Sequence, residues 1–206
     1  MFGARYLTCS CYRRQPFFED DWIKQEFVDA LVRAHRRHGF GLIAWVIMPE
    51  HIHLLLIPRL PESPVSTVLH MLKSSHSRRV LGRWRKQRSP RLREVQASAG
   101  EERFWQAGGG YDRNPDEWDG LASIVRYIHR NPVARGLVEK PGDWPWSSVH
   151  WYLKKPSPIE LVDPRLFRQE ELARLTEGRS TREVIEMMRK SREMPRKNDV
   201  AVDGSE

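Results

Sequence analysis

The chain has 206 residues, of which 39% are hydrophobic and 30% charged, and its net charge at neutral pH is +8. This length allows one well-buried core with extensions, or at most two small domains. The positive charge favours a polyanionic partner, of which nucleic acid is the commonest. No apolar run approaches the roughly 20 residues that span a bilayer, so we expect no membrane partner.

The only two cysteines are Cys9 and Cys11. Two cysteines cannot form a disulfide framework, so we expect a reduced, cytoplasmic protein. Two residues apart on a strand, they could in principle bind a metal, but we interpret them as small strand residues.

The first part of the chain predicts a strand, a helix and a hairpin. Arg5 to Cys11 is rich in Tyr, Leu and Thr, which is typical of a strand. Asp20 to His38 predicts a helix, because apolar residues recur every four positions and basic residues crowd its last turns. Gly41 to Met48 and His51 to Ile57 predict two strands joined by a tight turn at Pro49-Glu50.

The middle of the chain continues the alternation. Ser66 to Lys86 predicts a second helix, Phe104 to Gln106 a short strand, and Asp116 to about His129 a third helix. Asn131-Pro132 marks the end of that helix or a kink, since a residue before Pro is biased away from the helical region. This order predicts an α+β fold with helices on one face of a mainly antiparallel sheet.

The composition changes past Pro141, where Trp144, Trp146 and Trp151 lie close together. We expect one domain over residues 1–155 and a helical C-terminal extension over 156–206, with helices at Gln169 to Thr176 and Thr181 to Arg192. A disordered tail is predicted from Arg196 onward.

The most informative feature is the pair His51 and His53, which directly follows the Pro-Glu turn. Side chains at i and i+2 of a strand project from one face, so the two imidazoles should converge where they could hold a metal ion. A lone His-x-His is a weak signal, and two packed core histidines are the alternative.

Tyr127 and Asn131 are four residues apart and share one helix face, if the helix persists that far. Tyr127 could then point at a metal that Asn131 helps to hold. The alternatives are an amphipathic boundary tyrosine and a helix-capping asparagine. A histidine pair beside a tyrosine suits transesterification of phosphodiesters, because a phenol becomes a useful nucleophile when a divalent metal polarises the phosphate. The phosphotyrosine product would retain the phosphodiester energy for rejoining.

The second predicted helix carries basic residues with no acid between Lys73 and Arg93. We predict phosphate contacts from this helix, with a solvated helix face as the alternative. Arg130, beside Tyr127 and Asn131 on the third helix, could touch the scissile phosphate or be a surface residue. The predicted DNA-binding residues are Lys73, Arg78, Arg79, Arg83 and Arg130.

Four blocks of the sequence, in this order, resemble the REP-associated tyrosine transposases, within the single-tyrosine HUH transposases. They are Trp45 to Leu56 with Met-Pro-x-His-Ile-His-Leu-Leu-Leu, Lys73 to Arg79, Phe104-Trp105-Gln106 followed by Tyr111-Asp112, and Tyr127 to Val138. Trp144 to Ser148 also belongs to the pattern. The resemblance covers roughly residues 5 to 152.

The resemblance implies a ferredoxin-like (RRM-like) fold, a transposase that cleaves and rejoins DNA, and Tyr127 as its nucleophile. It implies His51, His53 and Asn131 as ligands of Mg²⁺ or Mn²⁺, of which Mn²⁺ tolerates nitrogen ligands better. The implied substrate is a single-stranded hairpin of repetitive extragenic palindromic (REP) DNA, and the implied enzyme is a nucleoid-associated monomer acting in cis.

One departure concerns Glu50, which stands where the family often has Asn. It could tune the site, reach the metal or shape the turn, and we favour the turn. Two other functions compete with strand transfer. One is a hairpin-binding regulatory or architectural protein. The other is a metallohydrolase in which the histidines activate water.

Overall fold

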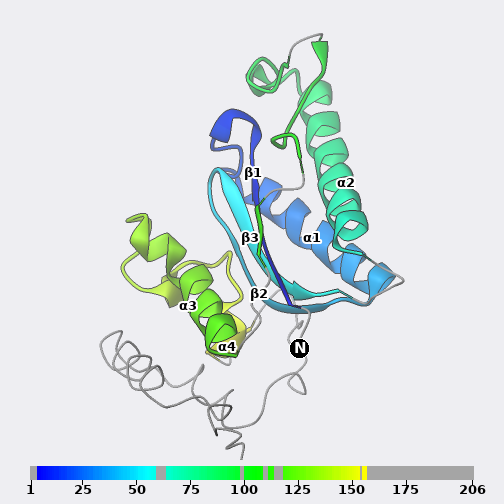
Figure 1. The fold of residues 1–206 in the computed structure, drawn as a ribbon. Coiled ribbons are helices and arrows are strands. Elements are labelled where there is room, and N and C mark those ends of the chain that lie inside the picture. Colours follow the sequence, from blue (N-terminus) through cyan, green and yellow to red (C-terminus); the bar gives the residue numbers. More distant parts are fainter. Residues whose placement is uncertain are drawn as a thin grey trace, which may run out of the picture.

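The computed structural model describes most of the first 156 residues (Figure 1). The described ranges are 4–58, 64–97, 100–108, 111–113, 118–153 and 155–156. The predicted helices at 169–176 and 181–192 and the predicted tail lie outside them. In the described part, none of the helices is long and apolar enough to cross a membrane.

The centre of the fold is an antiparallel four-stranded sheet in the order β2-β3-β1-β4. Its strands are β1 (Arg5–Ser10), β2 (Gly41–Ile47), β3 (His51–Ile57) and β4 (Tyr111–Arg113). With α1 (Asp21–His38) after β1 and α2 (Val65–Lys86) after β3, this is the ferredoxin-like order that was predicted.

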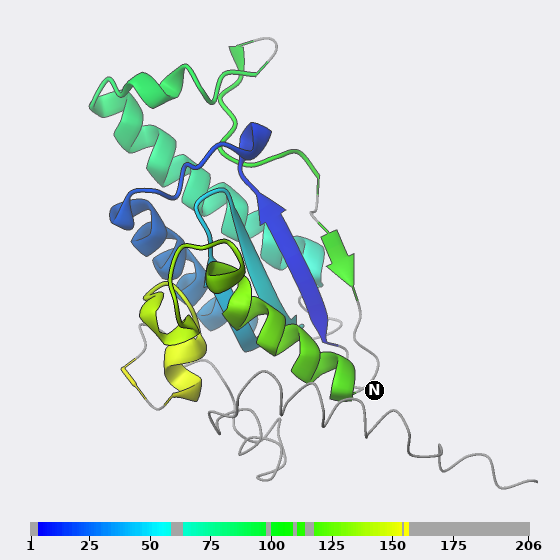
Figure 2. The same cartoon turned by 90° about the vertical axis from the view of Figure 1, so that its left-hand side faces the viewer.

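Helices cover both faces of this sheet (Figures 1 and 2). α1 and α2 pack together on one face, as predicted, where Ile52, Leu54 and Leu56 of β3 join their core. The prediction of helices on one face fails for α3 (Trp118–Ala134), which covers the opposite face over β2 and β3. Leu55 of β3 packs there, because neighbouring strand residues point to opposite faces.

Two predicted boundaries differ from the structure. Phe104 to Gln106 is not a strand: Trp105 makes only an isolated bridge to Cys11, and the fourth strand is Tyr111–Arg113. Phe104 and Trp105 are both buried in the aromatic core, so the alternation of a half-buried strand is absent, and pairing is limited to this one bridge. α3 also continues past Asn131 to Ala134, with Pro132 in its last turn.

The segment after α3 returns to the edge of β2. It contains a short 3-10 turn, η4 (Pro141–Asp143), and one helical turn, α4 (Val149–Tyr152). Ser147 bridges to Val46, and Ser148 Oγ accepts the backbone N–H of Trp45 at 2.9 Å. The Trp-Pro-Trp-Ser-Ser motif therefore ties the chain after α3 to the sheet.

Candidate active site

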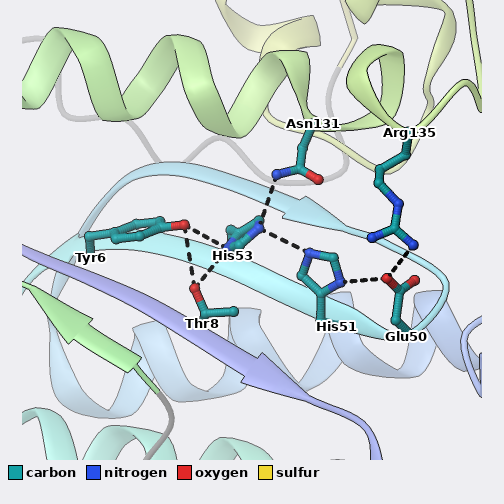
Figure 3. A network of polar contacts seen from close by, with 7 residues as sticks. All are labelled: Tyr6, Thr8, Glu50, His51, His53, Asn131 and Arg135. Carbon is teal, nitrogen blue, oxygen red and sulfur yellow. Dashed lines mark hydrogen bonds and ion pairs between the residues drawn. The ribbon is translucent and has the colours of Figure 1, made fainter. Parts of the chain in front are cut away.

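His51 and His53 lie on the α3 face of β3, and both are buried. Their Nε2 atoms are 3.0 Å apart, so the two imidazoles converge as the strand spacing predicts (Figure 3). β3 lies between β2 and β1, and this interior position in the sheet fixes the backbone beneath the pair.

His53 is oriented by two hydroxyls of the neighbouring strand β1. Tyr6 Oη and Thr8 Oγ1 each lie 2.9 Å from His53 Nδ1, and Thr8 is the register partner of His53 (Figure 3). When both hydroxyl oxygens accept from Nδ1–H, the Nε2 lone pair faces the site. Such outer contacts are what hold a metal-binding histidine in its tautomer.

His51 is oriented by an acid. Its Nδ1 lies 3.2 Å from Glu50 Oε1, and the same oxygen lies 2.8 Å from a guanidinium nitrogen of Arg135 (Figure 3). Glu50 therefore accepts from His51 on the side away from Nε2. Of the roles considered for Glu50, this contact supports tuning the site as well as forming the turn.

α3 contributes Asn131 and Tyr127, one helical turn apart. Asn131 is buried and its Nδ2 lies 3.1 Å from His53 Nε2. A half-turn of the amide would present Oδ1 there instead. Tyr127 is 54% exposed, and its ring centroid lies 5.5 Å from that of His53. The phenol is thus accessible to a large substrate beside the buried histidines.

Burial keeps both histidines neutral at physiological pH. It lowers the pKa of His53 to about 3, with a further contribution from His51. The pKa of His51 is also lowered, mainly by burial, although Glu50 opposes this and Arg135 and Arg14 reinforce it. Neutral imidazoles have free lone pairs, which a metal ligand requires.

The donor atoms fit a divalent cation. In an octahedron with bonds of about 2.1 Å, adjacent ligand atoms are about 3.0 Å apart, close to the 3.0 and 3.1 Å separations found at His53 Nε2. Within the described residues, no group of three His, Cys, Asp or Glu side chains could hold a metal. The Asn131 amide, 3.1 Å from His53 Nε2, could supply a third protein ligand, and this donor set suits Mn²⁺ or Mg²⁺.

One open cavity of about 630 Å³ lies between the sheet and α3, and it is lined by Tyr6, Thr8, His51, His53, Tyr127 and Asn131. Ser123 and Ile124 of α3 also line it, as do Arg14 and Arg135. The volume is that of a site for a small ligand or a few nucleotides, and it brings the phenol, the histidine pair and two guanidinium groups together.

The predicted DNA-binding residues are not part of this cavity. Four of them lie on α2, which covers the opposite face of the sheet. Lys73 Nζ donates to the carbonyl oxygens of Gln106 and Gly108, at 3.2 and 2.7 Å. Arg130 is exposed on α3 but does not line the cavity. Any phosphate contacts made by α2 are therefore remote from the histidines.

The other three α2 residues are exposed arginines. Arg79 lies 3.7 Å from Glu26, and the guanidinium of Arg83 lies 4.3 Å from the ring centre of Trp22. Cys9 and Cys11 are buried free thiols on or next to β1, which agrees with their interpretation as packed small residues.

Comparison with protein families gives the class of the molecule. Residues 4–131 match the family described as "Transposase IS200 like". The match covers more than half of the chain and ends at Asn131. It therefore includes His51, His53, Tyr127 and Asn131. The chain belongs to this transposase family.

Two individual relatives show to which group of this transposase family the chain is similar. The chain is 30% identical over 150 residues to a Haemophilus influenzae protein described as a REP-associated tyrosine transposase, covering 72% of this chain and 80% of the relative. The Escherichia coli REP-associated tyrosine transposase is 27% identical over 123 residues, which is 59% of this chain and 61% of that protein. The predicted membership of the REP-associated tyrosine transposases is confirmed.

A solved structure of a REP-associated tyrosine transposase bound to a REP hairpin has a similar fold. The TM-score is 0.58 at 22% identity, covering 74% of this chain and 80% of that one. At this identity the likeness concerns the fold alone, and it confirms the α+β class.

Tyr6, Thr8, Arg14 and Arg135 were not among the site residues predicted from the sequence. Tyr6 and Thr8 could have been found, because alternate residues of the first strand share a face with a paired strand's histidines. Arg14 and Arg135 carry no comparable signal, since loop arginines are usually solvated.

Proposed function

We propose that this transposase is a metal-dependent single-stranded DNA endonuclease and strand transferase that cleaves and rejoins DNA at REP-type hairpins. Tyr127 is the nucleophile, and His51, His53 and Asn131 hold Mg²⁺ or Mn²⁺. The observation that carries the proposal is the Tyr127 ring, exposed to solvent and 5.5 Å from the His53 ring in one cavity.

The chemical step is an exchange of phosphate esters. The Tyr127 oxygen forms a bond to phosphorus while the bond from phosphorus to the 3′ oxygen breaks. The phenolic proton passes to solvent and the leaving 3′ oxygen takes up a proton. The products are a 5′-phosphotyrosine and a free 3′-hydroxyl, and attack by a 3′-hydroxyl on the phosphotyrosine rejoins a strand.

The bound cation would supply Lewis-acid stabilisation of charge on the phosphate. The chain's own residues prepare its site: Tyr6 and Thr8 orient His53, and Glu50 orients His51. Burial keeps both imidazoles neutral, so no proton competes for their Nε2 atoms.

The hairpin substrate is supported by the family and by the fold shared with a transposase bound to a REP hairpin. A monomer acting in cis is supported by the ring contact between Tyr127 and His53 within one chain. Function in the cytoplasm, at the nucleoid, belongs to the same proposal.

The test is a covalent-adduct assay with labelled single-stranded hairpins from palindromes flanking the gene. Wild type with Mn²⁺ should give a denaturant-resistant protein–DNA band that EDTA abolishes and that Tyr127→Phe lacks. An adduct retained in Tyr127→Phe would exclude Tyr127 as the nucleophile. Cleavage without an adduct would instead support hydrolysis by activated water.

The second candidate is a DNA-hairpin-binding regulatory or architectural protein with little nuclease activity. The basic surface of α2, on the sheet face opposite to the cavity, favours it, because binding there needs none of the cavity residues. Tight hairpin binding by wild type and Tyr127→Phe alike, with no cleavage in Mn²⁺, would support this function.

A further inference from the structure

Arg14 ends η1 (Tyr12–Arg14), the 3-10 turn that follows β1, and it lines the cavity with His51, His53 and Tyr127. Its φ is 54°, and that of Arg13 is 52°. Both lie in the left-handed region, which is disfavoured for residues with a Cβ. Two consecutive strained arginines persist only where the surroundings impose the conformation, and such strain clusters at functional sites.

The surroundings of η1 impose it through hydrogen bonds to the site and to a distant segment. Cys11 N–H donates to the carbonyl of Glu50 at 2.8 Å, and Arg14 N–H donates to that of Cys11 at 3.0 Å. Arg13 N–H donates to Gln106 Oε1 at 3.2 Å. The turn is therefore tied directly to the residue before His51, which fixes the backbone of Arg14 relative to the histidines, while its side chain is exposed.

The two adjacent arginines differ in what their guanidinium groups meet. That of Arg13 lies 5.0 Å from the ring centre of Tyr12, and Arg13 does not line the cavity. Arg14 lines the cavity, and no carboxylate in the described part of the chain forms an ion pair with it. The other cavity arginine, Arg135, is already paired with Glu50 at 2.8 Å. Arg14 is thus the cavity cation left available for an anion.

We propose that Arg14 is a further catalytic residue, whose guanidinium binds a non-bridging oxygen of the scissile phosphate. This rests on the proposed function. As the bond from Tyr127 forms and the bond to the 3′ oxygen breaks, negative charge grows on the non-bridging oxygens. A guanidinium fixed beside them stabilises that charge without gaining or losing a proton. This role was considered for Arg130 from sequence, but Arg130 does not line the cavity.

The first test measures coupling between Arg14 and one phosphate. Hairpin DNA with a neutral methylphosphonate at the cleavage position is compared with unmodified DNA, using Tyr127→Phe so that no cleavage occurs. The neutral group should weaken binding by Tyr127→Phe about tenfold, and the double variant Tyr127→Phe/Arg14→Ala should lose most of this difference. Equal sensitivity in the two proteins would overturn the proposal. The cleavage position is mapped first with wild-type protein, so a failure of the proposed function appears there as absent cleavage and is distinct from a failure of the role of Arg14.

The second test measures the single-turnover cleavage rate, with Arg13 as the matched control. Arg14→Ala should slow cleavage about 100-fold at saturating DNA, whereas Arg13→Ala, the same charge change one residue away, should slow it less than about threefold. Equal losses in the two variants would show that only general charge matters and would overturn the proposal.

Glycine variants separate the chemical role from folding. Gly adopts a positive φ without strain, so Arg14→Gly and Arg13→Gly should each raise the Tm by about 2–4 °C. Arg14→Gly should nonetheless lose cleavage, and Arg13→Gly should retain it. A folded Arg14→Gly protein that cleaves at the wild-type rate would overturn the proposal.

Discussion

The guanidinium of Arg135 lies 2.8 Å from the carboxylate of Glu50, and this ion pair joins the chain just after α3 to the turn between β2 and β3. The helix of Tyr127 and Asn131 is thereby linked to the strand of His51 and His53 (Figure 3). Because Glu50 also contacts His51, one carboxylate influences both the orientation of an imidazole and the placement of the helix over it.

Glu50→Gln should lower the affinity for Mn²⁺ about 10- to 100-fold, which is the usual cost of removing an outer contact to a metal-binding histidine. The amide can still accept from His51 Nδ1, but it loses the charge that supports the imidazole and pairs with Arg135. Isothermal titration calorimetry on the DNA-free protein measures the change, with the exposed Glu139→Gln as control. An unchanged affinity for Mn²⁺ would show that Glu50 serves only to form the turn.

The order of the predicted strands and helices was sufficient to predict an α+β fold with a mainly antiparallel sheet, and the family resemblance added the ferredoxin-like topology. The order was not sufficient to assign α3 to a face. The apolar stripe of Leu121, Val125 and Ile128 shows that the helix is amphipathic, but the outer face of the sheet is apolar too, through residues such as Ile43 and Leu55. Either face could have received the helix.

The convergence of the His51 and His53 side chains could be predicted because their spacing of two residues on a strand is local. Tyr127 was singled out by the family resemblance more than by its spacing from Asn131, and its ring lies 5.5 Å from that of His53. Asn131 was harder to place, since the following Pro132 suggested that the helix ends, yet a proline in the last turn leaves Asn131 helical. Arg14 could not be found, because its position depends on a left-handed turn held by Glu50 and Gln106, far away in sequence.

His76 should make the metal-free protein less stable in mild acid. It is fully buried among aromatic rings and contacts the carbonyl of Ile23, and burial lowers its pKa to about 3. Between pH 6.5 and 3, His76 is protonated in the unfolded chain but stays neutral in the folded protein. The free energy of unfolding therefore falls with falling pH, by about 1.4 kcal/mol per unit for each such histidine.

The measurement is urea unfolding in EDTA at several pH values between 4 and 7, for wild type and His76→Gln. The variant should be about 1–3 kcal/mol less stable at pH 7, because it loses aromatic packing. Its free energy of unfolding should fall less steeply with falling pH than that of wild type, and the difference in slope should correspond to about one bound proton. Parallel curves for the two proteins would contradict a neutral buried His76. His51, His53 and His129, whose pKa values burial also lowers, contribute to the remaining slope.

Arg78 offers a test of whether α2 contacts DNA. It is exposed on the face of the molecule opposite to the cavity. If it contacts a phosphate, Arg78→Ala should reduce the slope of log affinity against log salt by about one. The cleavage rate at saturating DNA should change less than about threefold, since the residue is remote from the histidines. Fluorescence anisotropy at several salt concentrations measures the slope, and an unchanged slope would identify the arginine as part of a solvated helix face.

Asn131 can be tested for the atom that it offers to the site. If Oδ1 is the ligand, Asn131→Asp keeps an oxygen in place and adds charge, so Mn²⁺ affinity should be retained or rise. Asn131→Leu should lower it at least about tenfold. If instead the amide only donates from Nδ2 to His53 Nε2, as the 3.1 Å contact would allow, it competes with the metal for that lone pair, and neither substitution should lower the affinity. Titration of Mn²⁺ followed by electron paramagnetic resonance, with Tyr127→Phe as a control that keeps all three ligands, distinguishes the two cases.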